Sequence, residues 1–474
     1  MATAIPVNTA SFSVDEIVRA TGASIVVRGA THVGHVSTDS RAVGAGGLFV
    51  ALSGERHDAH DFLPSLQERQ LGAVLVSRRD VVAPPGATVL LVDDTTRALG
   101  ALARLHRDRW GGRVVAITGS AGKTTTRRAA AALLAGGGRR VHASSGNLNN
   151  LVGAPMVLLG LTAAHDTAVV ELGTSAPGEI ARLAELARPD LGVLTLVALA
   201  HASGLGSLDE IEREKGALLR ALGEGAQAVV NADDPRARAA VRASRATPVL
   251  YGHATDADVR IVSRAPRGVS GSTLELAVGS RSLVVETPLL GRAGALATAA
   301  AVAICRAELG HLPDAQAISG ALLPLGAEAT SRLTATLLSQ DIVLIDDSYN
   351  ANRASMESSI EAASELAAAR AARLVLVLGE MKELGAASAG EHAAVGRAAA
   401  AASPGLVVAV GGAARGILDE VPGRFGEDAA AAAAALLEAL RPGDVVLVKG
   451  SRSVGLERVV SAVTARFAPV GGAA

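Results

Sequence analysis

A glycine-rich loop between an apolar run and an Ala-rich helix is the first feature with clear chemical potential. Val114–Thr118 is followed by Gly119-Ser-Ala-Gly-Lys-Thr-Thr125 and then by the helical pattern. Glycines let backbone N–H groups curl around phosphate oxygens, and a helix N-terminus adds partial positive charge. The pattern favours a nucleoside triphosphate site over an ordinary glycine-rich turn. The residues expected to bind the phosphates are Gly119, Ser120, Ala121, Gly122, Lys123, Thr124 and Thr125, with the Thr124 hydroxyl placed to bind Mg²⁺.

Lysine is rare in this chain. Of the 45 basic residues (Lys+Arg), lysine occupies only positions 123, 215, 382 and 449. A preference for Arg and Ala codons explains the low lysine content of the chain as a whole. Such a preference should leave lysine mainly at positions where arginine cannot replace it. Arginine stays charged, whereas lysine can lose its proton or act as a compact point charge. Lys123 fits this expectation because phosphate loops need a lysine that reaches the outer phosphates.

Three further residues lie where they could reach the bound phosphates. Glu171 ends an apolar run, and His201 follows the run Leu191–Leu196 by a short loop. Ligands bind at the carboxyl edge of open α/β sheets, so both side chains should face the phosphate loop. Lys215 lies on the next helix, and the three residues together could build a metal site. Singly, Glu171 could cap a helix, His201 could be a loop histidine and Lys215 could be solvated.

Length, charge and cysteine content restrict the class of protein. The 474 residues predict two to four domains, and the 49% hydrophobic content is enough for several cores. A formal net charge of −1 argues against nucleic acid and anionic membranes as partners. We expect neither a signal peptide nor a membrane-spanning segment. The single cysteine, Cys305, excludes an intramolecular disulfide and fits a reducing compartment.

The elements that must position these residues follow an α/β pattern in three domains. Residues 1–110 form a mixed region, and residues 111–326 alternate apolar runs with helical patterns, as in a parallel sheet with crossover helices. Within that second region, residues 258–290 predict appended antiparallel strands and Gly294–Leu309 predicts a helix. Residues 327–474 form a second α/β unit, whose predicted strands are Ile342–Ile345, Arg373–Leu378, Leu406–Val410 and Val445–Val448.

Taken together, the motifs resemble those of the Mur ligase family along essentially the whole chain. The short loop matches the family form G-[TSN]-x-G-K-[TS], which explains its unusual spacing. Further matching segments are Ser37-Thr-Asp-Ser-Arg41, Gly47–Gly54, His57–Phe62, Gly146–Asn150 with Gly153–Pro155, Glu171–Gly173 with Pro177–Ile180, Asp346–Asn352 with Ser355-Met356, Gly379–Gly385, His392 and Lys449–Arg452. The segment Asp346–Asn352 marks the branch that adds D-alanyl-D-alanine.

The resemblance implies a fold and an activity. It implies a uridine-nucleotide domain, a central ATP-binding domain and a C-terminal Rossmann-like domain. The expected enzyme is a cytoplasmic ATP-dependent ligase of peptidoglycan precursor synthesis. It would phosphorylate the terminal carboxylate of UDP-N-acetylmuramoyl-tripeptide and let D-alanyl-D-alanine attack the acyl phosphate. Nothing in the sequence forms an obvious subunit interface, so we expect a monomer.

The resemblance also assigns roles to residues. Thr124 and Glu171 would hold one Mg²⁺, and His201 with a carbamylated Lys215 would support a second. Because its amine can lose a proton and capture CO₂, Lys215 could become a metal-binding carboxylate, which arginine could not. The resemblance assigns catalysis to Lys123, Lys215, His201 and Arg332. It places Asp346 and Asn350 at the border of the nucleotide site. The residues that it assigns to substrate binding are Ser40, Arg41, Asn149, Asn150 and Ser175.

Several positions depart from the family pattern and leave alternatives open. Gly291–Ala297 lacks the histidine and asparagines that usually face the adenine, so Ala293, Gly294 and Ala297 stand in their place. Other departures are Ala59, Leu196, Ala217, Ser331 and Arg353. A related ligase that builds a different amide in specialised metabolism is therefore an alternative, as is a non-catalytic nucleotide-binding protein. The sequence does not decide between lysine and diaminopimelate in the tripeptide.

Overall fold

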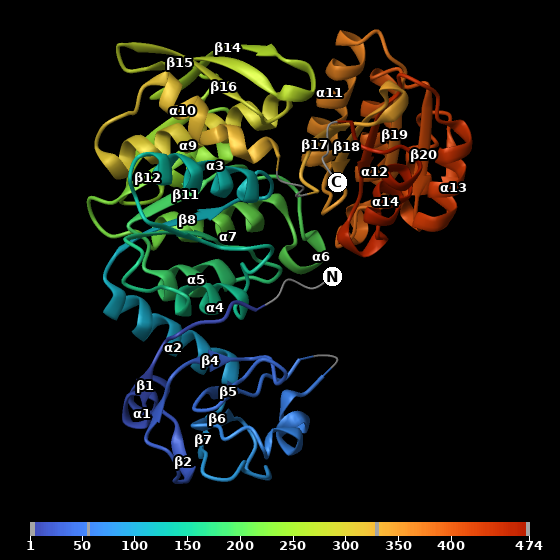
Figure 1. The fold of residues 1–474 in the computed structure, drawn as a ribbon. Coiled ribbons are helices and arrows are strands. Elements are labelled where there is room, and N and C mark those ends of the chain that lie inside the picture. Colours follow the sequence, from blue (N-terminus) through green and yellow to red (C-terminus); the bar gives the residue numbers. More distant parts are fainter. Residues whose placement is uncertain (1–4, 55–56, 328–330, 471–474) are drawn as a thin grey trace.

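Three α/β lobes follow one another along the chain (Figure 1). The structure is a computed structural model that describes residues 5–54, 57–327 and 331–470. The expected three-domain α/β architecture is confirmed, with each lobe built on its own main sheet. None of the helices in the described part of the chain combines the length and hydropathy needed to span a bilayer.

The N-terminal lobe is a small mixed sheet with few helices. Its five strands have the order β2 (Ser24–Val27), β7 (Thr88–Leu91), β6 (Ala73–Val76), β5 (Leu48–Val50) and β4 (Val36–Ser37), and only β2 runs antiparallel to its neighbour. The remaining elements are β1 (Phe12–Ser13), β3 (His32–Val33), α1 (Val14–Thr21) and the 3₁₀ helix η1 (Ala59–Leu66). Helix α2 (Thr95–Trp110) then leads to the central lobe and packs against its helices α4 and α5.

The central lobe is built on a nine-stranded sheet. The strand order is β16 (Arg281–Thr287), β15 (Ser272–Val278), β14 (Val259–Pro266), β13 (Thr247–Gly252), β12 (Gln227–Asn231), β11 (Leu191–Leu194), β8 (Arg113–Thr118), β10 (Thr167–Glu171) and β9 (Val141–Ala143). The strands from β9 to β14 are parallel. The antiparallel pairing expected for residues 258–290 holds for β14 with β15 and for β15 with β16, but β14 itself joins the sheet parallel to β13.

Helices cover both faces of this sheet, so its strands are apolar on both sides. Along β8, Val114 and Ala116 face one core while Val115 and Ile117 face the other. The helices are α3 (Lys123–Gly136), α4 (Gly153–Leu159), α5 (Glu179–Ala187), α6 (Ala202–Leu205), α7 (Leu208–Arg220), α8 (Pro235–Arg242), α9 (Gly291–Leu309) and α10 (Ala315–Leu322). Helix α9 contains the helix predicted from Gly294–Leu309.

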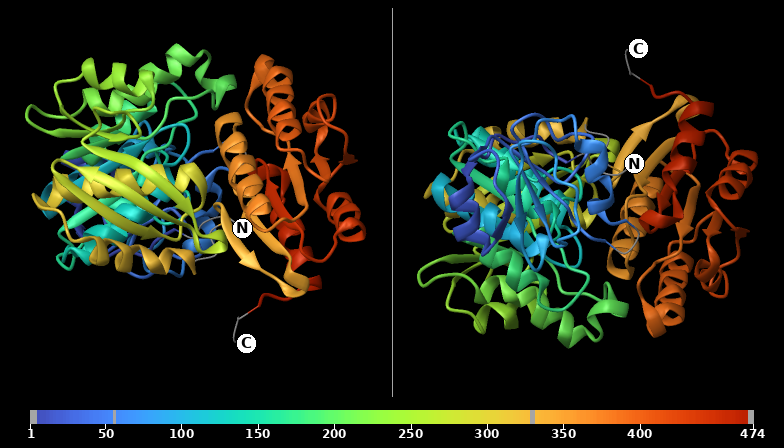
Figure 2. Two further views of the ribbon diagram at one scale, coloured as in Figure 1. Left: turned by 90° about the horizontal axis from the view of Figure 1, so that it is seen from above. Right: turned by 90° about the horizontal axis from the view of Figure 1, so that it is seen from below.

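The C-terminal lobe repeats the doubly covered design on six strands. Their order is β17 (Thr334–Leu337), β18 (Val343–Asp347), β22 (Val445–Lys449), β19 (Leu374–Gly379), β20 (Leu406–Val410) and β21 (Arg424–Gly426), and only β17 is antiparallel. The α-helices are α11 (Arg353–Ala369), α12 (Ser388–Ala401), α13 (Ala429–Ala439) and α14 (Glu457–Arg466). Helix α11 packs against α9, so this lobe lies beside the central one (Figure 2).

Candidate active site

The phosphate loop occupies the carboxyl end of β8 and leads directly into α3. Gly122 has a φ of +82°, and its place as the N-cap leaves the first N–H groups of α3 without a side-chain cap among the described residues. Gly119 has a φ of +148°, and a Cβ there would lie 2.0 Å from Thr195 Oγ1. Both positions therefore require glycine, and the first turn of α3 can donate its N–H groups to an anion.

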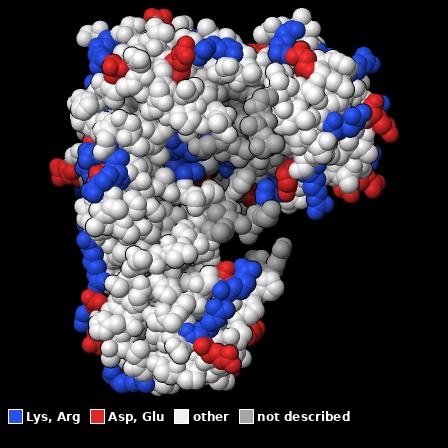
Figure 3. Space-filling view, viewed as in Figure 1, with Lys and Arg blue, Asp and Glu red and all other residues white. Residues whose placement is uncertain are grey.

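A cavity of about 1110 Å³ opens in front of this loop, between the central and C-terminal lobes. In the space-filling view the molecule is hollowed between its lobes, and Lys and Arg atoms are visible in a recess near the middle of that face (Figure 3). The sequence-predicted residues that line the cavity are Ser120, Ala121, Gly122, Lys123, Thr124, Thr125, Asn149, Asn150, Glu171, Ser175, His201, Arg332 and Asn350. Gly119, Lys215 and Asp346 are not among the lining residues, and Ser40 and Arg41 lie in the N-terminal lobe.

Lys123 and Glu171 place opposite charges at the base of the cavity. Lys123 Nζ donates a 2.7 Å hydrogen bond to the backbone oxygen of Gly119. Burial lowers the pKa of Lys123, although Glu171 partly opposes the shift. Burial alone would raise the pKa of Glu171, but Lys123, Arg332 and Arg127 together lower it. Glu171 is only 2% exposed and is nevertheless held as a carboxylate.

Glu171 is the centre of a polar cluster made by β10, α3 and the loop before α4. Thr124 Oγ1 donates to Oε2 at 2.9 Å, and Asn149 Nδ2 donates to Oε1 at 2.9 Å. Arg127 Nε lies 3.6 Å from Oε2 and is buried with no hydrogen-bond partner among the described residues. The sequence analysis missed Arg127, although it follows Lys123 by one helical turn and shares its face of α3.

His201 lies between the two lobes. It precedes α6 with a φ of +55°, and its Nδ1 contacts the Glu383 carboxylate from the C-terminal lobe. Burial lowers the pKa of His201, and Glu383 acts in the opposite direction. The contact with Glu383 joins residues 182 positions apart and was not predicted.

Lys215 is buried on α7 and is only 1% exposed. Burial, followed by the positive charge of Lys123, lowers its pKa to about 7. The solvated alternative is therefore wrong. A neutral amine is accessible to this side chain near neutral pH, whereas an exposed lysine keeps its proton.

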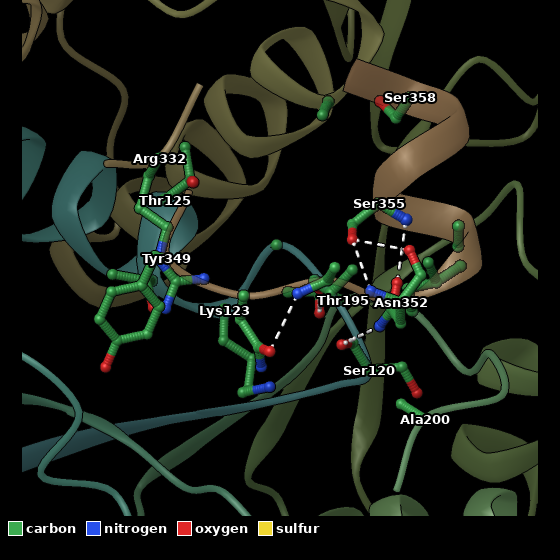
Figure 4. Close-up of a pocket in the computed structure, with 18 of the residues that line it drawn as sticks. Ser120, Lys123, Thr125, Thr195, Ala200, Arg332, Tyr349, Asn352, Ser355 and Ser358 are labelled. Atoms are coloured by element: carbon green, nitrogen blue, oxygen red, sulfur yellow. Dashed lines mark hydrogen bonds between the residues drawn. The ribbon is translucent and has the colours of Figure 1, made fainter. Parts of the chain in front are cut away.

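The C-terminal lobe contributes an arginine and a rigid loop. The Arg332 guanidinium lies 4.0 Å above the centre of the Tyr349 ring, beside the phosphate loop (Figure 4). Lys449 Nζ lies 2.6 Å from Asp347 Oδ2 and donates to the Asn350 backbone oxygen at 2.9 Å. Asp346 is used locally, since its Oδ1 accepts from Ser348 N and Oγ. These contacts fix the loop that carries Tyr349 and Asn350 into the cavity.

The remaining predicted residues have local partners or small side chains. Asn150 Oδ1 accepts from the N–H groups of Val152 and Gly153 at the start of α4. Arg41 is exposed and forms a two-bond pair with Asp39. Ala293, Gly294 and Ala297, which the resemblance places beside the adenine, also line the cavity.

The donor set fits a hard cation at one position. Among the described residues there is no group of three or more His, Cys, Asp or Glu side chains that could hold a metal ion. Thr124 and Glu171 nevertheless present a hydroxyl and a carboxylate side by side, and Mg²⁺ prefers a few such oxygen ligands together with substrate phosphates. An unmodified Lys215 offers no ligand to a metal while it is protonated.

Comparison with protein-family models places the chain in a known context. Residues 32–107 match the model described as Mur ligase family, catalytic domain, and residues 117–305 match the Mur ligase middle domain. Residues 331–452 match the model described as Mur ligase, glutamate ligase domain. The three matches follow the order of the three lobes.

Curated proteins and solved structures agree with these matches. The chain is 38% identical to the UDP-N-acetylmuramoyl-tripeptide–D-alanyl-D-alanine ligase of Escherichia coli, over 90% of this chain and 93% of the relative. It is 31% identical to the protein of the same name from Bacillus subtilis, over 90% and 92%. A crystal structure of MurF from Acinetobacter baumannii superimposes with a TM-score of 0.85 at 28% identity, over 97% and 99%. MurF ligase from Thermotoga maritima in complex with ADP gives 0.79 at 28% identity, over 90% and 96%.

Proposed function

The chain belongs to the Mur ligase family, and we propose that it joins D-alanyl-D-alanine to the terminal carboxylate of UDP-N-acetylmuramoyl-tripeptide. The products are UDP-N-acetylmuramoyl-pentapeptide, ADP and phosphate, which is the reaction of EC 6.3.2.10 in peptidoglycan synthesis. The observation that carries the proposal is the convergence of Lys123, Glu171 and Arg332 from two lobes on one cavity in front of the phosphate loop. Phosphorylation of a carboxylate requires charged groups of this kind next to the phosphates of ATP.

The first step makes the carboxylate reactive. A carboxylate is a poor electrophile for an amine, so its oxygen attacks the γ-phosphorus of ATP and ADP leaves. Lys123 and Arg332 stabilise the negative charge that spreads over the transferred phosphoryl group. The resulting acyl phosphate hydrolyses readily, so the reaction requires that the two lobes close around it and exclude water.

The second step forms the amide. The neutral amine of D-alanyl-D-alanine attacks the acyl carbon, a proton leaves the nitrogen, and phosphate departs from the tetrahedral intermediate. We assign Asn149, Asn150 and Ser175 to the acceptor side of the cavity because they line it next to Glu171 and His201. Ser40 and Arg41 are assigned to the uridine nucleotide in the N-terminal lobe, and Asp346 and Asn350 to the border of the ATP site.

Mg²⁺ is part of the proposal. Thr124 and Glu171 would hold one ion, which supplies positive charge to the phosphates when bound. A second ion needs a further carboxylate, which Lys215 can provide as a carbamate formed from its neutral amine and CO₂ with loss of one proton. The burial of Lys215 and its pKa of about 7 support this modification. His201 would complete that second ligand set.

The site of action and the oligomeric state are part of the same proposal. We expect the reaction to take place in the cytoplasm, and the free, buried Cys305 is compatible with a reducing compartment. We expect a monomer to be sufficient, because every group assigned above belongs to one chain. The partners are then ATP and the two small substrates.

A substrate assay tests the proposed function. The enzyme is incubated with ATP, D-alanyl-D-alanine and either the lysine or the diaminopimelate form of the UDP-linked tripeptide. Phosphate release and the mass of the pentapeptide product are then measured. We expect product with one or both tripeptides, and the absence of phosphate release with both would overturn the assignment.

A second candidate rests on one specific observation. Ala293, Gly294 and Ala297 leave the cavity wall around them without the polar side chains of the family motif. A ligase with another amine or carboxylate substrate is compatible with such a wall. It would release phosphate only with substitute substrates, so the same assay separates the two candidates.

A further inference from the structure

One loop of the C-terminal lobe reaches into the central lobe and contacts His201. The loop, residues 380–384, follows β19, and its Glu383 carboxylate meets His201 Nδ1. The backbone oxygen of Glu383 also accepts a 2.9 Å hydrogen bond from Ser203 N, two residues beyond the histidine. Side chain and main chain of the same residue therefore engage the same turn.

This loop is held rigidly by its own lobe. Met381 N donates to His392 Nε2 at 2.9 Å, and His392 Nδ1 in turn contacts the backbone oxygen of Ser388 at 2.7 Å. Lys382 N donates to Ser451 Oγ at 2.9 Å. Glu383 itself has a φ of +64°, a conformation that a non-glycine residue adopts only when its surroundings impose it. The hydrogen bonds of the neighbouring residues Met381 and Lys382 therefore hold the Glu383 carboxylate in place.

The histidine is equally constrained. His201 has a φ of +55° and its ring lines the cavity. In a neutral imidazole one ring nitrogen carries the proton and the other an unshared pair. Since the Glu383 carboxylate can only accept, Nδ1 must donate, and the unshared pair belongs to Nε2. Among the described residues no hydrogen bond engages Nε2.

We propose that Glu383 is a positioning residue of the ligase reaction, which fixes the tautomer and the orientation of His201 when the C-terminal lobe is docked. This inference rests on the proposed function, because it concerns a histidine that lines the cavity assigned to the ligase reaction. Carboxylates that orient a working histidine in this way are a general device, and their loss lowers activity or metal affinity by about 10–100-fold.

A purely structural role for Glu383 is the competing interpretation. In that case any contact that helps the two lobes to dock should matter equally. The chain offers a matched control, because Arg264 on β14 contacts the carboxylate of Glu365 on α11 across the same pair of lobes, and Glu365 does not line the cavity. The variant Glu365→Gln weakens an interlobe ion pair without touching His201.

The experiment uses the full chain in three variants: Glu383→Ala, Glu383→Gln and Glu365→Gln. We expect Glu383→Ala to lower kcat by about 10–100-fold with KM for ATP changed less than about threefold. Glu383→Gln retains an acceptor for Nδ1–H and should restore most of kcat. Glu365→Gln should leave kcat near that of the wild type.

A spectroscopic readout tests the orientation independently of turnover. The protein is labelled with ¹⁵N-histidine, and the His201 signals are identified by their loss in His201→Gln. Wild type and Glu383→Gln should give the Nδ1–H pattern, and Glu383→Ala should shift towards the Nε2–H pattern. Unchanged His201 signals in Glu383→Ala, or an equal loss of kcat in Glu365→Gln, would overturn the proposal. A wild type that shows the Nδ1–H pattern but forms no product would instead sink the proposed function alone.

Discussion

Asn352 in the C-terminal lobe donates a 3.0 Å hydrogen bond from Nδ2 to the backbone oxygen of Ser120 in the phosphate loop (Figure 4). The same side chain is the N-cap of α11, where its Oδ1 accepts from Ser355 N at 2.9 Å. One amide thus begins a helix in one lobe and contacts the nucleotide loop of the other. The placement of α11 and of the phosphate loop is coupled through this residue.

The two roles of Asn352 can be separated by mutation. Asn352→Asp keeps a good N-cap but replaces the donor with an acceptor beside the phosphates, so it should raise KM for ATP about tenfold at almost unchanged Tm. Asn352→Ala loses both roles and should also lose about 1 kcal/mol of stability. Steady-state kinetics and thermal unfolding measure the two effects. Equal KM values for Asn352→Asp and the wild type would contradict the coupling.

The pair formed by Thr124 and Glu171 makes a prediction about Mg²⁺. Thr124→Ala removes the hydroxyl that lies 2.9 Å from Glu171 Oε2, and it should lower kcat by about 100-fold, the scale seen when one transition-state contact is lost. Thr124→Ser retains the hydroxyl and is the matched control. Activity measured against Mg²⁺ concentration should show a higher half-saturating value for Thr124→Ala only. Removal of Mg²⁺ with a chelator should abolish activity in every variant.

The sequence was sufficient to predict the strands that carry apolar side chains on both faces of the sheet. Val114–Thr118 and Leu191–Leu194 are such runs, and both are central strands. Strand β13 was missed because Pro248 interrupts it and its first residues are exposed. Short edge strands such as β9 and β17 contain only partly buried residues, so their sequences show no clear hydrophobic pattern. Hydrophobic periodicity reports burial, so it finds the centre of a sheet better than its edges.

Local motifs likewise predicted the phosphate loop but not its long-range partners. Loop, Glu171 and His201 meet because carboxyl ends of parallel strands share one edge of a sheet. The pairing of Lys449 with Asp347 depends on β22 lying next to β18, although many elements separate them in the chain. Contacts between lobes, such as that of Glu383 with His201, form only when the lobes dock. No motif or residue spacing in the sequence marks them.

Lys449 is predicted to stabilise the C-terminal lobe. It is 1% exposed, and its partner Asp347 is also buried. Lys449→Met leaves the Asp347 carboxylate without its cation, which should cost about 3–5 kcal/mol. The double variant Lys449→Met with Asp347→Asn should recover a large part of the loss. Calorimetry of both variants checks this, and an unchanged transition in the single variant would show that the pair contributes nothing.

Lys215 is predicted to make stability depend on pH. Its pKa falls from 10.5 to about 7 on folding. Below about pH 7 the amine is charged in both the folded and the unfolded chain. The cost of burying that charge then lowers the free energy of unfolding by its full amount. Between about pH 7 and the unfolded value only the unfolded chain keeps the proton, so the stability of the wild type rises with pH in that window.

Replacing Lys215 by methionine removes this penalty. In CO₂-free buffer, Tm of Lys215→Met should exceed that of the wild type by about 4 °C or more near pH 6, since 1 kcal/mol moves Tm by about 2–4 °C in domains of this size. The difference should narrow towards about pH 9, where the native amine is already neutral. Lys382→Met is the control, because Lys382 is half-exposed beside Glu380 and should show no such trend. A difference that stays constant over this range would mean that Lys215 is not the group whose proton is lost.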